Sequence, residues 1–393
     1  MPAITYPGVG RRISYQRRLR RMTQQQLAYA AGASLGAVRK IERGERNPSH
    51  DMVDAFADAM GVDPAVLLYD RAPTRTPVHD ALPGLSAAIA TYDLPDEGPV
   101  RSTAELRTAV TEAVRWRLAA QYTRIARTMP DLLPELSRAY HRSSGAERAD
   151  LAALMVKAYR SADAVAYKFG AHDLSARLVD LIRWAATESG DPLQSATAAY
   201  VRTETFFAAR THAAGLRALE QALDTAPAPI GRAQTAARGA LHMRAAVIAG
   251  RAGNAAAVHT HLAEARILAD RLPEGVYTGT AFGPDSVRTH EVSVAVSLGH
   301  DHVTKALGIA HEWKPSTDLP AERRSGFYIE LARAQLWAGR AEHAFESLQA
   351  ARRIAPQHTR AHPWVRQDAA TLRRLKRADS ESLSNFAEWC AAT

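Results

Sequence analysis

Apolar residues near the start of the chain recur at the spacing of short helices. A first helix is predicted over residues 13–22, with arginines largely opposite a loose apolar face. That face comprises Ile13, Tyr15, Leu19 and Met22. Thr23, followed three residues later by Gln26, has the pattern of a capping box and starts a second helix. Gly32 can adopt the left-handed conformation that ends this helix, and Ser34 is a good N-cap for a third.

The third helix has one apolar and one cationic side. Val38 and Ile41 form its inward face. The outward face consists of Leu35, Gly36, Arg39, Lys40 and Arg43. Two short helices joined through a glycine turn, the second presenting cations, predict a helix-turn-helix whose second helix enters the major groove.

Residues 71–101 interrupt the helical pattern. Five prolines, at positions 73, 77, 83, 95 and 99, surround one short helical pattern at 85–92. Because proline fixes φ and removes a backbone donor, we expect a semi-extended linker with a short helix. From residue 102 onward the chain is rich in alanine with a 3.6-residue period, and no strand pattern competes. Helix breaks are expected at 130–134, 143–145, 170, 190–192, 227–231, 250–253, 273–283, 299, 315 and 339.

A helix–turn–helix unit recurs in the second part of the chain. Its clearest copy, 327–356, turns at Gly339 and places small residues at Ala332 and Ala344, where two helices approach closely. Looser copies lie at 243–270 and 287–315. These offsets resemble a degenerate tetratricopeptide repeat. Residues 102–390 are therefore expected to stack as one right-handed α-solenoid with a concave surface, and an irregular helical bundle is the alternative.

Charge separates the two parts of the chain. Residues 1–50 hold ten Lys/Arg and two acids, whereas the whole chain carries only +9. Clustered cations of this kind attract phosphates, which favours DNA as the partner of the first part. No apolar run is long enough to cross a bilayer, no secretory signal is found at the N-terminus, and the single cysteine cannot form an internal disulfide. We expect a cytoplasmic protein with no membrane contact.

The first part resembles the phage-repressor or Xre-type family of DNA-binding domains. The resemblance covers residues 10–70 and rests on GRRI at 10–13, MTQQQLA at 22–28, AG at 31–32, IERGER at 41–46, NPS at 47–49 and GV at 61–62. It implies a five-helix domain, with helices four and five at 52–59 and 64–68. A helical hairpin that binds a protein partner is the alternative.

The resemblance also implies roles for single residues. Gln24 is expected to bind a phosphate and brace the recognition helix, and a pair between Arg17 and Glu42 is expected to hold helix one against helix three. Arg39 and Lys40 are suited to guanine edges. Leu35 can contact a thymine methyl, but Gly36 offers no side chain, so direct base readout is expected to be thin. The full expected DNA-binding set is Gln24, Gln25, Ser34, Leu35, Gly36, Arg39, Lys40, Arg43 and Arg46.

The whole architecture resembles actinobacterial transcriptional regulators that carry tetratricopeptide repeats, and some related architectures are quorum regulators that bind peptides. Peptide-binding solenoids commonly use Asn side chains, and this body has only Asn254 and Asn385, so a small hydrophobic or amphipathic effector is an equal candidate. Concave positions on the first helices predict a ligand-binding set of Tyr200, Glu204, Arg244, Arg288, His290, Ile329 and Arg333.

Enzyme chemistry and metal binding find little support. The chain has no phosphate-binding Walker loop, GxSxG, HExxH or paired cysteine motif. His259 and His261 point about 200° apart on a helix, so they do not share one metal ion, and no cofactor is expected.

Together these patterns predict one domain organisation and one function, with one alternative function. The expected domains are a helix-turn-helix domain at 1–70, a linker at 71–101 and a helical-repeat sensor or dimerisation domain at 102–393. The expected function is a homodimeric transcriptional regulator that binds a palindromic operator in double-stranded DNA and responds to a small-molecule or peptide effector. The alternative is an interaction scaffold whose solenoid binds a partner protein and whose first domain is a DNA tether.

Overall fold

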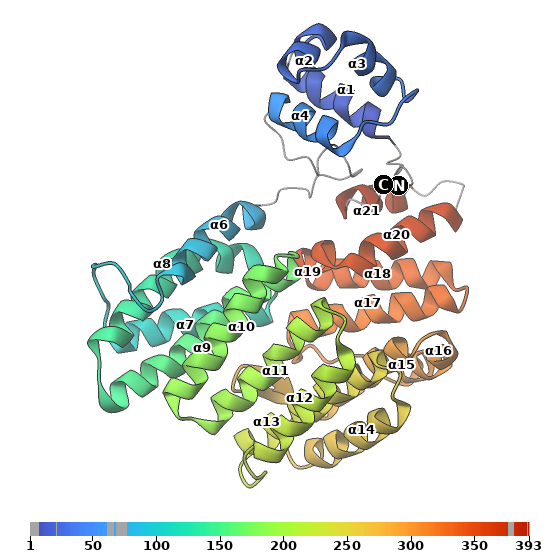
Figure 1. Ribbon diagram of the computed structural model, residues 1–393. Helices are drawn as coiled ribbons and strands as arrows, with labels where there is room; N and C mark the ends of the chain where they lie inside the picture. Colours follow the sequence, from blue (N-terminus) through green and yellow to red (C-terminus); the bar gives the residue numbers. More distant parts are fainter. Residues whose placement is uncertain are drawn as a thin grey trace. The chain divides into compact units, whose positions relative to one another are not determined.

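A computed structural model of the protein describes residues 8–20, 22–60, 67, 77–375, 381–390 and 392. The chain divides into two compact units, Met1–Thr76 and Pro77–Thr393 (Figure 1). The described residues are almost entirely helical, as the expected all-α fold class of a repressor-type domain followed by stacked helix pairs requires.

Four helices form the described part of the first unit: α1 (Val9–Leu19), α2 (Gln24–Ala30), α3 (Leu35–Glu42) and α4 (His50–Met60). The capping box that starts α2 is present, since Gln26 N donates to Thr23 Oγ1 at 3.1 Å and Thr23 N donates to Gln26 Oε1 at 2.8 Å. Ser34 caps α3 by accepting from Ala37 N at 3.1 Å. The expected fifth helix at 64–68 lies outside the described residues, apart from Leu67.

Helices α1 and α3 of this unit approach very closely. Ile13, Val38 and Ile41 are fully buried between them and their neighbours. Gly10 permits the contact, because a Cβ at this position would lie 1.8 Å from the Ile41 carbonyl oxygen. The position of α3 is thus fixed by backbone contact as well as by its apolar face.

The second unit begins with three helices that precede the pairs: α6 (Pro77–Ala90), α7 (Thr103–Leu118) and α8 (Tyr122–Arg142). Successive pairs follow: α9 (Gly145–Lys168) with α10 (His172–Ser189), α11 (Pro192–Ala208) with α12 (His212–Thr225), α13 (Arg232–Arg251) with α14 (Ala255–Ala269), α15 (Pro284–Leu298) with α16 (Val303–Glu312), and α17 (Ala321–Trp337) with α18 (Ala341–Ile354). The remaining elements are β1 (Gly275–Tyr277), β2 (Thr280–Phe282), η1 (His300–His302), α19 (Pro356–Ala361), α20 (Pro363–Leu375) and α21 (Glu381–Trp389).

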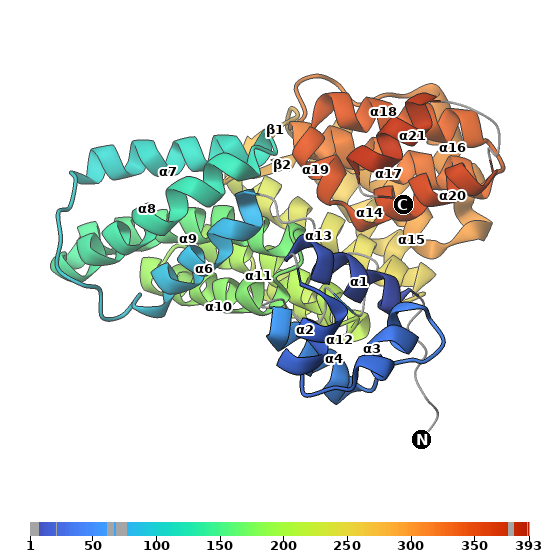
Figure 2. The same cartoon turned by 90° about the horizontal axis from the view of Figure 1, so that it is seen from above.

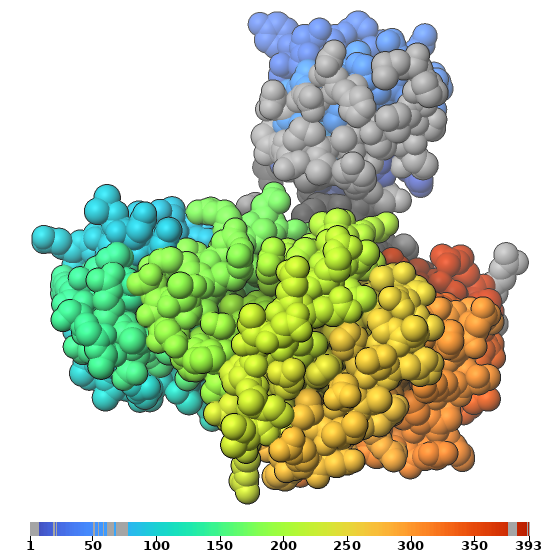
Figure 3. Space-filling model, turned by 60° about the horizontal axis from the view of Figure 1, so that its bottom comes forward, coloured from blue at the N-terminus to red at the C-terminus, as the bar shows by residue number. Residues whose placement is uncertain are grey.

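The pairs stack in sequence order, so that each first helix lies beside the next: α9, α11, α13, α15 and α17 are consecutive neighbours. The surface of the unit follows the same order, from cyan through green and yellow to orange (Figure 3). The three repeat copies expected at 243–270, 287–315 and 327–356 correspond to the pairs α13–α14, α15–α16 and α17–α18.

The two ends of the stack also meet within this unit. Helix α7 contacts α17, and Lys168 Nζ on α9 pairs with Glu322 Oε1 on α17 at 2.9 Å. Thr123 N on α8 donates to Gln357 Oε1 on α19 at 2.9 Å. The two ends of the stack therefore contact each other.

Three local expectations differ from the structure. Residues 77–101 belong to the second unit rather than to a separate linker, since α6 starts before the expected 85–92 and buries Val78, Leu85 and Ile89 in the core. Helix α8 runs through Pro130 and Pro134 without a break. The free energy gained by burying the apolar face of α8 offsets the cost of these prolines, which is roughly 3 kcal/mol for each one in a helix interior.

The third difference is a short antiparallel hairpin. Strands β1 and β2 pair Gly275 with Phe282 and Tyr277 with Thr280. The turn residues Thr278 and Gly279 have φ of 47° and 74°, the left-handed values that a tight hairpin turn requires. The hairpin lies beside the end of α7 (Figure 2), where Arg117 donates to the Gly279 carbonyl.

Candidate nucleic-acid interface and ligand cavity

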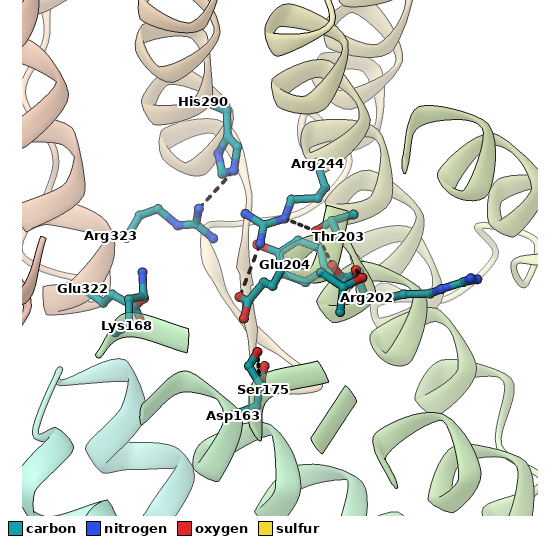
Figure 4. A network of polar contacts seen from close by, with 12 residues as sticks. Asp163, Lys168, Ser175, Arg202, Thr203, Glu204, Arg244, His290, Glu322 and Arg323 are labelled. Carbon is teal, nitrogen blue, oxygen red and sulfur yellow. Dashed lines mark hydrogen bonds and ion pairs between the residues drawn. The ribbon is translucent and has the colours of Figure 1, made fainter. Parts of the chain in front are cut away.

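A cavity of about 250 Å³ lies inside the second unit. Side chains from α9, α11, α13, α15 and α17 converge on it, and the β1–β2 turn contributes Gly279. Figure 4 shows the polar groups of these helices pointing toward one another. The first helices of successive pairs thus supply one shared site.

Charged groups dominate the lining of this cavity. The cations are Arg117, Arg160, Lys168, Arg244, Arg251 and Arg323. The carboxyl groups are Asp163, Glu204, Glu322 and Glu330. Among the described residues, ion pairs within 4.0 Å involve only two of the six cations: Lys168 with Glu322 at 2.9 Å, and Arg244 with Glu204 at 3.4 Å.

Neighbouring groups hold two of the arginines in place (Figure 4). Arg244 Nε donates to Thr203 Oγ1 at 2.6 Å, and its guanidinium lies 4.8 Å from the centre of the Tyr200 ring. An Arg323 amino group lies 3.0 Å from His290 Nε2, while His290 Nδ1 lies 2.8 Å from the Ser286 carbonyl oxygen. Both contacts are satisfied when His290 is neutral with its proton on Nδ1, so that Nε2 accepts from Arg323.

The surroundings shift the pKa values of the lining groups. Burial raises the pKa of Asp163 well above its usual value, and the nearby Glu204 carboxylate raises it further. Burial likewise raises the pKa of Glu330 to about 7. Burial alone would raise the pKa of Tyr200, but the charges of Arg244, Arg323 and Arg160 lower it to about 8. The six cations of the lining therefore outnumber its ionised carboxyl groups.

The histidines of the cavity are neutral. Burial and the neighbouring Arg323 lower the pKa of His290 well below its usual value. Burial and the Lys168 ammonium lower the pKa of His358 to about 3. Neutral imidazoles add no charge, so the net charge of the cavity is set by the arginines, Lys168 and the carboxyl groups.

The cavity brings together four of the seven expected ligand-binding residues: Tyr200, Glu204, Arg244 and His290. The other three do not line it. Arg288 is exposed on α15, and Ile329 is fully buried in a hydrophobic core, where it packs against other side chains. Arg333 pairs with Asp368 at 2.8 Å and lies 4.3 Å over the Trp364 ring.

Metal binding and membrane insertion find no support in the described residues. No three His, Cys, Asp or Glu side chains among them are grouped as metal ligands would be. His261 instead contacts His242, with 3.0 Å between the Nδ1 atoms. None of the described helices combines the length and the hydropathy that a transmembrane span needs.

In the first unit, the outward face of α3 is open to solvent. Ser34, Gly36, Arg39 and Lys40 are exposed, and Leu35 is half-buried. No atom lies within 4 Å of a Cβ added at Gly36. Four more residues of the expected DNA-binding set surround this face: Gln25, Arg43 and Arg46, which are exposed, and Gln24, which is half-buried.

Glu42 ties α3 to the two preceding helices. Arg17 on α1 donates from Nε to Glu42 Oε1 at 2.7 Å and from a terminal nitrogen to Oε2 at 2.9 Å. Gln24 on α2 donates to Oε2 at 2.8 Å. Burial alone would raise the pKa of Glu42, but hydrogen bonds from Arg17 and Gln24 and the Arg17 charge lower it. The expected Arg17–Glu42 pair is present, and Gln24 braces α3 through its hydrogen bond to the same Glu42 carboxylate.

Comparison with known proteins identifies this part of the chain. Residues 9–68 match the family described as a helix-turn-helix domain. The protein thus carries a helix-turn-helix domain at its N-terminus, and the matched residues include α1 to α4. No match to the chain is found among curated proteins.

Two types of solved structure are similar to the chain over much of its length. Bacillus thuringiensis PlcR in complex with the peptide PapR7 and DNA is 14% identical, with a TM-score of 0.30, over 67% of this chain and 94% of that one. The apo form of the competence regulator ComR from Streptococcus vestibularis is 13% identical, with a TM-score of 0.27, over 95% and 98%. ComR from S. thermophilus is also 13% identical, with a TM-score of 0.23.

The repeat pattern did not predict several of the residues that line the cavity. Arg117, Arg160, Lys168, Arg251, Arg323 and the carboxyl groups other than Glu204 belong to this set. A signal was available in α9, where Arg160, Asp163 and Tyr167 follow one another at helical spacing within an apolar run. Polar residues on one face of a helix that is otherwise apolar indicate that this face lines a cavity.

Proposed function

We propose that the protein is a sequence-specific DNA-binding transcriptional regulator whose α3 enters the major groove. The observation that carries the proposal is the exposed face of α3, on which Arg39 and Lys40 point away from a core that fixes the helix. Arginine and lysine on such a helix are suited to guanine edges. The Arg17–Glu42–Gln24 contacts keep this face in position without occupying its cations.

We propose further that the regulator acts as a homodimer on a palindromic operator. One copy of α3 spans eight residues, and it includes Gly36, which has no side chain for a base contact. Such thin direct readout is compensated when two copies bind successive half-sites, typically about 34 Å apart. The proposed role is DNA binding rather than catalysis. A cytoplasmic location is consistent with it.

The second unit is proposed to sense an effector, a small molecule or a peptide, that modulates DNA binding. Its support is the cavity, which is lined by polar groups from five consecutive first helices. An effector changes DNA affinity only if it binds one conformation of the protein better than another.

The salt dependence of binding to duplexes of equal length and different sequence tests the proposal. The regulator predicts affinity that falls steeply between about 50 and 200 mM salt, together with a preference of about 10³-fold or more for certain sequences. Salt-sensitive binding without sequence preference would instead indicate a DNA tether on an interaction scaffold. Binding that is insensitive to salt and sequence would contradict both.

A further inference from the structure

The cavity of the second unit contains more positive charge than its carboxyl groups balance. Arg117, Arg160, Arg251 and Arg323 line it without a carboxylate within ion-pair distance among the described residues. Arg117 and Arg160 are each only 7% exposed. Six cations face four carboxyl groups, and burial raises the pKa of two of these, Asp163 and Glu330, which favours their neutral forms.

This excess of buried cations is expected to lower the stability of the folded protein. A buried charge without a partner is destabilising, and an arginine cannot relieve the cost by losing its proton at neutral pH. Burial and the nearby Arg117 charge lower the pKa of Arg160 to about 9, which still leaves its guanidinium charged. Arg117 Nε is buried without a hydrogen-bond partner. Clusters of perturbed groups in a cavity are typical of functional sites.

We propose that this cavity binds a small molecule that carries at least two negative charges on phosphate or carboxylate groups. Guanidinium groups match both of these oxyanions through paired hydrogen bonds. The volume of about 250 Å³ suits a compact ligand, since small-molecule sites commonly measure roughly 300–1,000 Å³. An extended peptide of several residues exceeds this space.

Two arginines are already oriented for such a ligand. Neutral His290 accepts from Arg323 and directs its guanidinium, and Thr203 does the same for Arg244 (Figure 4). The Tyr200 ring lies between cations, 4.8 Å from the Arg244 guanidinium and 5.4 Å from that of Arg160. Preorganised donors bind an anion with less loss of side-chain freedom.

The ligand would bridge the two ends of the stack. Arg160 and Lys168 lie on α9, the first helix of the stacked pairs, whereas Arg323 lies on α17 in the last pair. Charge repulsion among these cations opposes the contact between the two ends, and an anion between them removes that repulsion. Any consequence for DNA binding rests on the proposed function, but the binding of the anion does not.

Thermal unfolding of the full chain, followed by tryptophan fluorescence, tests this proposal. All six tryptophans lie in the second unit, so the signal reports the unit that holds the cavity. The probes are inorganic phosphate and citrate, each added at constant ionic strength with chloride as the reference. We expect at least one of them to raise the unfolding temperature by several degrees in a saturable way. The probe that acts distinguishes a phosphate ligand from a carboxylate ligand.

Variants assign the effect to the cavity. Arg323→Gln and, separately, Arg160→Gln are expected to weaken the binding of the active probe at least tenfold. Both are expected to fold, because each removes a cation that has no carboxylate partner, and circular dichroism verifies this. Arg288→Gln, which removes an exposed cation from α15, is the matched control and is expected to keep the shift.

Two results would overturn the proposal. One is the absence of a saturable shift with either probe, and the other is a shift of equal size in the two cavity variants. Neither result bears on the proposed DNA binding by the first unit, because the assay contains no DNA.

Discussion

Replacing Glu42 with alanine is expected to cost the helix-turn-helix unit about 3–5 kcal/mol, because the Arg17 guanidinium is then left buried without its counter-charge. The two side chains are only 10% and 5% exposed, and they share two hydrogen bonds of 2.7 and 2.9 Å. Gln24 also loses its acceptor. Since a small domain is stable by only about 5–15 kcal/mol, the variant unit is expected to open frequently.

Amide hydrogen exchange in the full chain measures this loss directly. Peptides from α1 and α3 are expected to lose protection, while peptides from the second unit serve as an internal reference. Glu45→Ala is the matched control, since its pair with Arg43 has side chains that are 62% and 48% exposed and contributes roughly 0–1 kcal/mol. Protection of α1 and α3 that stays within about 1 kcal/mol of the unmodified protein would refute the reasoning.

Three further predictions follow from single residues. Gly10→Ala is expected to destabilise the first unit by ~2 kcal/mol or more in denaturant unfolding, because its Cβ would meet the Ile41 carbonyl oxygen. Gly36→Ala, where the space is open, is expected to stabilise α3 by up to ~1 kcal/mol without a loss of DNA affinity, measured on the same duplexes. The pKa of Glu330 is raised to about 7 in the folded protein, so the unfolded chain loses this proton first and stability falls as pH rises from about 4.5 to 7. Glu330→Gln is expected to flatten that fall, by at most ~1.4 kcal/mol per pH unit in urea unfolding, and an unchanged slope would contradict it.

The sequence predicted the elements that depend on local chemistry. Thr23 with Gln26, and Ser34, start helices because a capping side chain needs only backbone groups within three residues. Gly253 and Gly339 mark turns because each takes a left-handed φ, of 73° and 74°. These constraints do not depend on the rest of the fold.

The sequence failed where distant parts of the chain decide the outcome. Strands β1 and β2 have three residues each, too few to show an alternating pattern. Helix α6 contains Pro83, which reads as a break, and its core contacts with α8 are not visible in the sequence. The polar positions on α9 indicate a face that lines a cavity, but they do not show which helices meet it, because the cavity depends on the stacking of five pairs and on the contact between α9 and α17.

The expected ligand-binding set shows both effects within a few residues. Tyr200 and Arg244 line the cavity because first helices do face the concave side, as the repeat pattern indicated. Ile329 lies on a first helix too, but its side chain points into a core. Arg323 was missed, although it precedes Ile329 by only six residues on the same helix, because the rotation of each helix about its axis is set by packing between pairs.

Selection of bound sequences from a randomised duplex pool at near-physiological salt tests the central claim most directly. The account predicts that the full chain enriches an inverted repeat and that Arg39→Ala with Lys40→Ala abolishes the enrichment. A variant with Arg11→Ala and Arg18→Ala, which removes two exposed cations from α1, is expected to weaken binding but to retain the same motif. Enrichment of the same inverted repeat by the Arg39→Ala, Lys40→Ala variant would contradict the assignment of α3 as the recognition helix.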